Sequence, residues 1–275
     1  MEQFDLRSAF NAISDVIHNR PLPIRQFDQI YMKAGDMVAQ AVFMAKRFDG
    51  LRTVFIGDGD CIALSALHLR QSGIIDFGPE QILLLDFDER ILNSVTRFAE
   101  KKKFSDRIEV RPYNVCDPLP SELIHSRDAF YTNPPWGASN DGDSVFVFME
   151  RGIEAAKERA ACMLVIADDP EIEWTQKVLR GAQRLANDHG FLVSEMIPEQ
   201  HVYHLDDAPD LKSCACVFRR RQRTDTWSDE SLCMDEERKW NFYGRENPLR
   251  FKYVLETSDL NYGMAPENSY TLEPL

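Results

Sequence analysis

One short stretch, Thr53–Asp60 (TVFIGDGD), constrains the fold of this chain more than any other. Its apolar residues Val54–Ile56 predict a strand buried on both faces, and a turn on Gly57 and Gly59 leads into a helix expected over Cys61–Leu67. Glycines let the backbone approach a ligand closely, and the first turn of a helix offers unpaired N–H groups. A buried strand, a glycine turn and a helix start therefore predict a nucleoside site in an α/β fold.

Two acids in this turn, Asp58 and Asp60, narrow the choice of ligand. Their carboxylates would repel the pyrophosphate of a dinucleotide and would attract a cation. The turn therefore favours a sulfonium nucleoside, S-adenosylmethionine or a relative, over NAD. Taken alone, the two glycines also fit a tight turn with a purely structural role.

The second predicted strand, Gln81–Asp86 (QILLLD), ends in an acid. Asp86 is placed to hydrogen-bond a ribose diol, with Phe87 beside it. Asp88 is expected to cap the helix that follows. Asn114 comes after the third predicted strand, where its amide oxygen is expected to meet an adenine amino group. The predicted cofactor-binding residues are Gly57, Asp58, Gly59, Asp60, Asp86, Phe87, Asn114 and Asn133.

The most specific motif is Asn133-Pro134-Pro135-Trp136, which follows a strand expected over Ala129–Thr132. The Asn133 side chain can accept a hydrogen bond from an amine, and the proline turn presents backbone carbonyls to the same nitrogen. The Trp136 ring offers a face for a planar base or for an ammonium group. The alternative is a proline turn around a buried tryptophan. The predicted catalytic residues are Asn133, Pro134, Trp136 and Asp58.

An aliphatic amine is protonated at neutral pH, so a transferase acting on it needs a base and an anionic pocket. Asp58 and Asp60 are candidates, together with the loop acids Asp206 and Asp207. Asp28 and Gln29 are expected either at the mouth of the site or as helix caps. His201 and His204 are expected to be loop or core histidines rather than metal ligands.

Composition limits the partners. The net charge of −13 argues against a nucleic-acid backbone as a partner, and the one basic run, Arg219–Arg223, is expected to be a solvated strand exit. An acidic surface suits a small cationic substrate. No apolar run approaches the roughly 20 residues of a membrane span, and no signal-peptide core is evident. The six cysteines form no CxxC pair, so we expect reduced thiols, a cytoplasmic location and no metal site.

The pattern predicts a Rossmann-like α/β fold, a mostly parallel sheet of seven strands with helices on both faces. We expect a helical cap over residues 1–50, a catalytic domain over 51–223 and an extension over 224–275 that packs locally or closes over the site. The later elements are expected as a helix over Ser144–Lys157, a strand over Ala161–Ala167, a helix over Trp174–His189, and closing strands over Phe191–Ile197 and Cys214–Arg219.

Taken together, these features resemble the class I S-adenosylmethionine-dependent methyltransferase fold. More narrowly, the chain resembles the branched-chain polyamine synthases, the bis(aminopropyl)spermidine synthase family, over about residues 24–200. The family implies transfer of an aminopropyl group from decarboxylated S-adenosylmethionine to a secondary amine of spermidine. The resemblance rests on Phe27–Gln29, Gly57–Asp60, Leu85–Arg90, Asp117–Pro120, Pro134-Pro135 and Arg151–Ile153.

Three departures keep alternatives open. Gly59 interrupts an acid-rich turn, Asn133 replaces the aspartate of an Asp-Pro-Pro motif, and the family's N-terminal winged-helix domain is reduced to a short cap. An Asn-Pro-Pro-Trp motif is typical of methyltransferases acting on exocyclic base amines or amide nitrogens. The family resemblance and the net charge of −13 nevertheless lead us to predict aminopropyl transfer to a polyamine. The alternatives are N-methylation with S-adenosylmethionine and a non-catalytic nucleoside-binding protein. The oligomeric state, a homodimer included, is left open.

Overall fold

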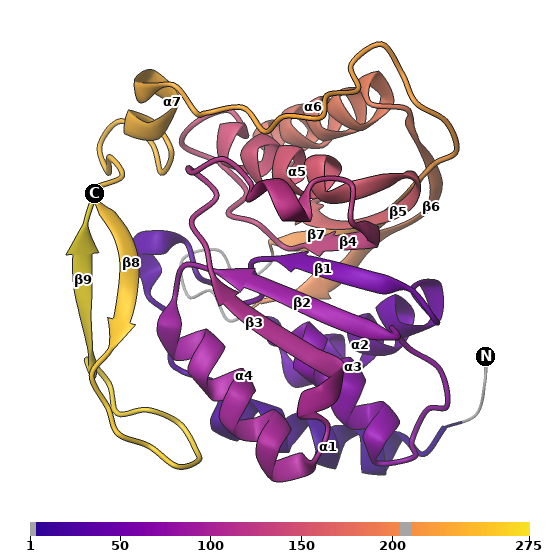
Figure 1. The fold of residues 1–275 in the computed structure, drawn as a ribbon, viewed down its shortest axis with the longest axis vertical. Coiled ribbons are helices and arrows are strands. Elements are labelled where there is room, and N and C mark those ends of the chain that lie inside the picture. Colours follow the sequence, from indigo (N-terminus) through magenta and orange to yellow (C-terminus); the bar gives the residue numbers. More distant parts are fainter. Residues whose placement is uncertain (1–3, 204–210) are drawn as a thin grey trace.

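The computed structural model describes residues 4–203 and 211–275. Within them, seven strands form one sheet in the order β3-β2-β1-β4-β5-β7-β6 (Figure 1). The first five strands are parallel, and β7 runs antiparallel to both of its neighbours. The strands are β1 Arg52–Ile56, β2 Gln81–Asp86, β3 Ile108–Pro112, β4 Arg127–Thr132, β5 Ala156–Ala167, β6 Phe191–Val202 and β7 Lys212–Arg220.

Helices cover both faces of the sheet, as Figure 1 shows. Successive side chains of a strand point to opposite faces, so Phe55 joins the core under α1–α4, whereas Val54 and Ile56 join the core under α5 and α6. The predicted α/β architecture is thus confirmed. The helices are α1 Leu6–Asn19, α2 Ala34–Arg47, α3 Ile62–Gln71, α4 Glu89–Lys102, α5 Asp143–Ala155 and α6 Glu173–Asp188, with short 3-10 turns at Arg25–Phe27, Ser105–Arg107 and Ser121–Leu123.

Two details near β5 differ from the sequence-based expectation. The helix predicted to reach Lys157 ends at Ala155, because β5 begins at Ala156 and pairs there with Arg127. Arg220, expected in a solvated run, is buried, and its guanidinium donates to the carbonyls of Ala156 and Lys157.

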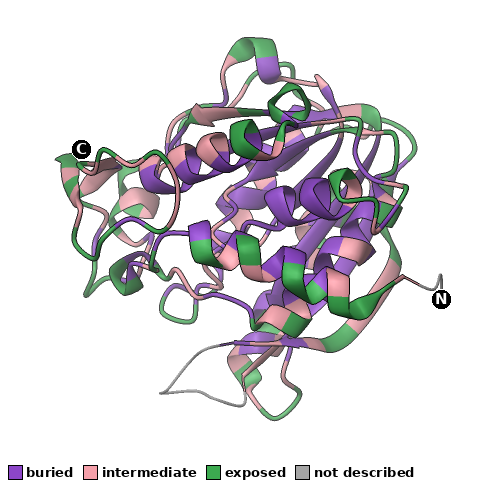
Figure 2. Cartoon of the chain, turned by 90° about the horizontal axis from the view of Figure 1, so that it is seen from below, coloured by how far each residue is buried: buried purple, intermediate pink, exposed green. Residues whose placement is uncertain are grey.

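The two N-terminal helices share a core with the sheet. Ile13 of α1 and Met37 of α2 belong to the same buried cluster as Phe55 of β1. Figure 2 shows helices that are buried on their inward faces and exposed on their outer faces. The domain boundaries at residues 50 and 223 stay predictions.

The C-terminal residues form structure that the sequence analysis did not predict. A short helix, α7 (Glu236–Trp240), precedes a hairpin of β8 (Phe251–Glu256) and β9 (Tyr270–Pro274). This hairpin is fixed beside the carboxyl end of β2, since the Val254 N–H donates to the Phe87 carbonyl at 3.1 Å. The extension therefore packs against the domain at the same edge as the predicted site.

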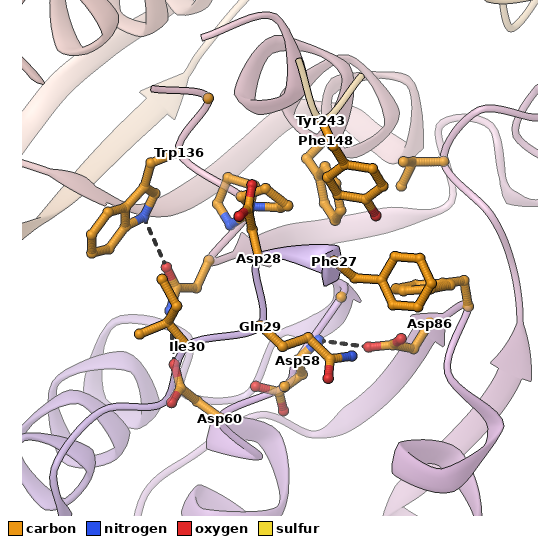
Figure 3. Close-up of a pocket in the computed structure, with 18 of the residues that line it drawn as sticks. Phe27, Asp28, Gln29, Ile30, Asp58, Asp60, Asp86, Trp136, Phe148 and Tyr243 are labelled. Carbon is orange, nitrogen blue, oxygen red and sulfur yellow. Dashed lines mark hydrogen bonds between the residues drawn. The ribbon is translucent and has the colours of Figure 1, made fainter. Parts of the chain in front are cut away.

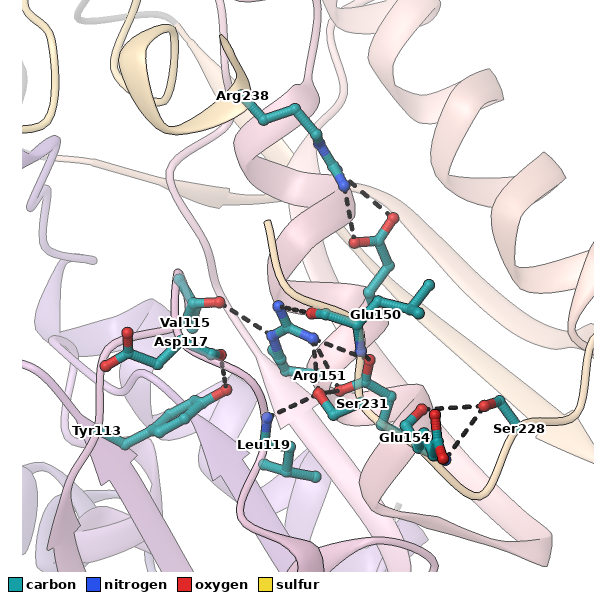
Figure 4. A network of polar contacts seen from close by, with 12 residues as sticks. Tyr113, Val115, Asp117, Leu119, Glu150, Arg151, Glu154, Ser228, Ser231 and Arg238 are labelled. Atoms are coloured by element: carbon teal, nitrogen blue, oxygen red, sulfur yellow. Dashed lines mark hydrogen bonds and ion pairs between the residues drawn. The ribbon is translucent and has the colours of Figure 1, made fainter. Parts of the chain in front are cut away.

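A buried arginine fastens the segment that leads to this hairpin (Figure 4). Arg151 is 1% exposed, and its guanidinium donates to the carbonyls of Val115 and Leu232 and to the Glu154 carboxylate. It also donates to the Ser231 hydroxyl at 2.9 Å. One side chain thus joins the loop after β3, helix α5 and the C-terminal segment. In the described part of the chain, no helix combines the length and the apolar character needed to cross a bilayer.

Candidate active site

A cavity of about 240 Å³ opens at the carboxyl ends of β1, β2 and β4. Its floor is the glycine turn, and its walls come from the 25–31 segment, from residues 133–138 and from the C-terminal extension. Figure 3 shows Phe27 and Asp86 on one side of this cavity and Trp136 on the other, with Asp28 between them. Parallel strands place their following loops at one edge, which is where ligands bind in such sheets.

The glycines of the turn are required by close packing. Gly57 has a φ of +70°, and a Cβ added to it would lie 3.0 Å from the Phe148 ring. A Cβ on Gly59 would lie 3.1 Å from the Tyr31 ring. Any side chain at either position would thus press on a ring that lines the cavity.

Asp58 holds the start of α3. Its carboxylate accepts hydrogen bonds from the N–H groups of Ile62 at 2.9 Å and Ala63 at 2.8 Å. Burial raises the pKa of Asp58 well above its usual range, and the neighbouring carboxylates of Asp60 and Asp86 act in the same direction. This geometry gives Asp58 a structural task, and its role as a base stays a prediction.

Asp86 is held at the end of β2 by backbone groups. Its carboxylate accepts from the Asp58 N–H at 3.0 Å and from the Asp88 N–H at 2.9 Å. Burial and the nearby Asp88 raise its pKa to about 7. Beside it, the Phe87 ring meets the Phe27 ring edge-on at 5.2 Å. Both Asp86 and Phe87 line the cavity, and their role in ribose binding stays a prediction.

Asn114 also lines the cavity, but its side-chain amide already makes hydrogen bonds within the protein. Its amide oxygen accepts from the Cys116 N–H at 2.9 Å, and its amide nitrogen donates to the Lys252 carbonyl of β8 at 2.7 Å. The predicted contact with adenine would have to share that oxygen. Asp88 caps α4, as expected, by accepting from the Arg90 N–H.

Asn133 lies at the end of β4 between an acid and an indole. Its amide nitrogen donates to the Asp60 carboxylate at 2.7 Å, and its oxygen accepts from the Trp136 Nε1–H at 3.3 Å. Asp60 also accepts from the Met32 N–H at 2.7 Å and lies 3.7 Å from the Arg20 guanidinium. Asn133 is thus fixed in one orientation at the wall of the cavity. Pro134 lines the cavity beside it.

Several lining residues escaped the sequence analysis. They are the aromatic side chains of Tyr31, Phe148 and Trp174. Phe242 and Tyr243 of the extension expected to pack locally or close over the site, and Tyr203 of the loop expected to wall a cationic pocket, line the cavity as well. Of the earlier candidates, Asp28 and Gln29 do line the cavity, and His201 is a core residue with no exposed surface. Asp206, Asp207 and His204 lie outside the described residues. Within the described residues, no three or more His, Cys, Asp and Glu side chains lie together in a way that could hold a metal ion.

The sheet order and a cavity on the glycine turn define a protein of the class I S-adenosylmethionine-dependent methyltransferase fold. Residues 8–247 match the model of the branched-chain polyamine synthase A C-terminal domain. The chain belongs to this family.

Two individual relatives are similar over part of their length. An N(4)-bis(aminopropyl)spermidine synthase of Thermococcus kodakarensis is 32% identical over 52% of this chain and 38% of its own length. An uncharacterized protein of Methanocaldococcus jannaschii is 29% identical over 67% of this chain and 43% of its own. The chain thus spans less than half the length of these two relatives.

A solved structure shows the same fold. It is the branched-chain polyamine synthase of Thermus thermophilus in complex with N4-aminopropylspermidine and 5'-methylthioadenosine. The likeness has a TM-score of 0.68 at 22% identity and covers 86% of this chain and 70% of that one.

Proposed function

We propose that this chain transfers an aminopropyl group from decarboxylated S-adenosylmethionine to a nitrogen of a polyamine. The observation that carries the proposal is membership of the branched-chain polyamine synthase family over residues 8–247. The Thermococcus kodakarensis relative is named for this kind of reaction, and the Thermus thermophilus structure holds an aminopropylated polyamine and 5'-methylthioadenosine.

The charge of the cavity supports this choice of substrates. Asp28, Asp58, Asp60 and Asp86 line it, and Arg25 is the one basic side chain among the lining residues that the structure describes. Intact S-adenosylmethionine would bring a further carboxylate into this acidic site, whereas the decarboxylated form brings none. A polyamine brings ammonium groups, which the site would attract.

The described residues also fit a nucleoside. The Tyr31 hydroxyl is buried, belongs to a lining residue and has no hydrogen-bond partner among the described residues. We propose that the Asp86 carboxylate accepts from a ribose diol. Gly57 leaves room where a Cβ would meet Phe148. We propose that the nucleoside lies along Gly57, Asp58, Gly59, Asp60, Asp86, Phe87, Asn114 and Asn133.

The reaction is an in-line displacement. The amine nitrogen forms a bond to the carbon next to sulfur as the carbon–sulfur bond breaks, 5'-methylthioadenosine leaves, and the amine proton passes to a base or to water. Catalysis is largely alignment, since a well-oriented pair of reactants avoids much of the entropic cost of meeting. We propose that Asn133, Pro134 and Trp136 orient the amine and that a carboxylate, Asp58 or Asp60, accepts its proton.

The test is a calorimetric titration with decarboxylated and with intact S-adenosylmethionine, followed by incubation with spermidine and chromatography of the products. We expect preference for the decarboxylated form and the release of 5'-methylthioadenosine. Preference for intact S-adenosylmethionine together with methyl transfer would instead support the Asn-Pro-Pro-Trp methyltransferase alternative. Binding of neither form would leave a non-catalytic protein.

Partners and location follow from the same features. We propose a small cationic amine as the substrate and no nucleic acid, because the net charge is −13. All six cysteines are unpaired and five are buried, which suits the reducing cytoplasm.

A further inference from the structure

A chain of buried hydrogen bonds leads from the cavity wall into the core. The Tyr203 hydroxyl, at a residue that lines the cavity, lies 2.8 Å from the Ser213 hydroxyl. Ser213 lies 2.9 Å from Nδ1 of His201, and Nε2 of His201 lies 2.9 Å from Oε1 of Gln40. Ser213, His201 and Gln40 have no exposed surface. A core built only for stability would not need four polar side chains in a row. Which atom donates in each of these hydrogen bonds determines where the Tyr203 hydroxyl hydrogen points.

The far end of the chain fixes that direction. The Gln40 amide nitrogen lies 3.2 Å from the Met163 sulfur and 3.5 Å from the Tyr131 hydroxyl. Because a thioether sulfur can only accept, the NH₂ group must face Met163 and the amide oxygen must face His201. That oxygen cannot donate, so Nε2 of His201 carries a hydrogen.

His201 itself is neutral. Burial lowers its pKa to about 4, and no other influence on this pKa is resolved. A neutral imidazole with a hydrogen on Nε2 has an acceptor at Nδ1. The Ser213 hydroxyl therefore donates to His201, and the Ser213 oxygen accepts from the Tyr203 hydroxyl. The Tyr203 hydroxyl hydrogen is thus donated to Ser213, and toward the cavity the Tyr203 oxygen can only accept hydrogen bonds.

Tyr203 stands beside the residues expected to meet the amine. Its ring packs edge-on against Trp136 at 4.8 Å. Burial raises the pKa of its hydroxyl well above the usual range and the Asp60 carboxylate acts in the same direction, whereas hydrogen bonds with Ser213 and Asn133 lower this pKa. The Tyr203 oxygen thus already accepts from the Asn133 amide, and an amine would share that oxygen. An attacking amine needs hydrogen-bond acceptors for its N–H groups so that its lone pair faces the reacting carbon. A tyrosine hydrogen pointing into the cavity would repel an ammonium group, and the observed direction avoids this.

We propose that His201 and Ser213 are positioning residues that turn the Tyr203 hydroxyl so that its oxygen accepts a hydrogen bond from the acceptor amine. This inference rests on the proposed aminopropyl transfer. It adds Tyr203 to the amine-binding side of the cavity and explains why its ring carries a hydroxyl.

The test compares Tyr203→Phe, Ser213→Ala and the double variant in the full chain, with kcat for spermidine and the affinity for 5'-methylthioadenosine as readouts. We expect each single variant to lower kcat by about tenfold or more, the loss typical of one hydrogen bond to a charged group. Because Ser213 acts through Tyr203, the double variant should be no slower than Tyr203→Phe alone. Affinity for 5'-methylthioadenosine should be unchanged in all three.

The matched control is Tyr131→Phe, which removes the same hydroxyl from the far end of the network. We expect its kcat to equal that of the wild type. Losses that multiply in the double variant, or an equal loss in Tyr131→Phe, would indicate a merely structural network and overturn the inference. If Ser213→Ala does not fold, Tyr203→Phe still decides, since an unchanged kcat would overturn it. Absence of transfer by the wild type would instead overturn the proposed function, and this inference with it.

Discussion

At the ends of β1 and β2, the carboxylates of Asp58 and Asp86 accept hydrogen bonds from backbone N–H groups of the turns that follow these two strands. At the end of β4, side chains from distant segments bond to one another. Asp86 accepts from the Asp58 and Asp88 backbone, whereas Asn133 reaches Asp60, 73 positions away, through side chains. We call these the ribose half and the amine half. The geometry of the ribose half is thus determined by the backbone of the turns after β1 and β2. The geometry of the amine half is determined by the packing of segments that are distant in the sequence.

The largest effect on turnover is expected in the amine half. Asn133→Ala removes the amide that is held between Asp60 and Trp136, so the amine loses a fixed partner. Misplacing a reactant costs about 100-fold in rate, and we expect at least this loss in kcat with little change in affinity for 5'-methylthioadenosine. Steady-state kinetics and calorimetry would measure the two quantities.

The control for this prediction is Asn187→Ala, the same change at an exposed position of α6. It should leave both kcat and affinity unchanged. A near-normal rate in Asn133→Ala would remove Asn133 from the amine half and would leave Tyr203 as its main polar candidate.

A substitution in the ribose half should weaken nucleoside binding rather than lower kcat. Asp86→Asn removes the charge that would accept from a ribose diol while keeping the size of the side chain. A hydrogen bond to a charged group contributes about 1.5–3 kcal/mol, so we expect affinity for 5'-methylthioadenosine to fall by about 10-fold or more. Calorimetry measures the change, and thermal unfolding shows whether the backbone contacts of Asp86 survive. Unchanged affinity would exclude the ribose role.

Asp86 also makes the ribose half sensitive to pH. Its pKa is about 7 in the free protein, and a ribose diol would favour the ionised form. Affinity for 5'-methylthioadenosine should therefore rise as the pH increases from 6 to 8, by up to about tenfold. Asp86→Asn should abolish this dependence, and a flat wild-type profile would contradict the assignment.

The stability of the free protein should move in the opposite direction. A carboxyl whose pKa is raised from 3.8 to about 7 by folding contributes fully to the free energy of unfolding below pH 3.8. That contribution is lost as the pH rises through about 7. Denaturant unfolding of wild type and Asp86→Asn across this range would isolate the Asp86 contribution.

The same comparison explains what the sequence could reveal. Asp86 was predictable because an apolar run ends at it, and Asn133 because its motif follows another such run. Both depend on local order along the chain. The capping task of Asp58 was harder to foresee, since a carboxylate in a glycine turn can face a ligand or the helix that follows it.

Tyr203 and the C-terminal hairpin depend on packing between distant segments. Tyr203 comes to the cavity because it pairs with Met32, far away in the sequence. Strands β8 and β9 are joined by a long loop rather than a tight turn, and their register is interrupted at Phe251. No short-range turn signal therefore marks this hairpin.

The smallest effect is expected at the mouth of the amine half. Asp28 is exposed, lines the cavity and has no side-chain hydrogen bond within the described residues, so its carboxylate is available to a distant ammonium group of a polyamine. An exposed ion pair contributes about 0.2–1 kcal/mol, so Asp28→Asn should raise KM for spermidine up to about fivefold with kcat unchanged. Asparagine tolerates the positive φ of 53° at this position, which keeps the backbone intact.

Salt separates this electrostatic effect from a change in shape. Raising the ionic strength should raise KM of the wild type toward that of Asp28→Asn, because exposed charges are screened. The matched control is Asp259→Asn, an equal charge change at an exposed residue that does not line the cavity. If both variants raise KM equally, the polyamine is attracted by the overall charge of −13, and a specific contact with Asp28 is excluded. If only Asp28→Asn does, the amine half extends to the 25–31 segment.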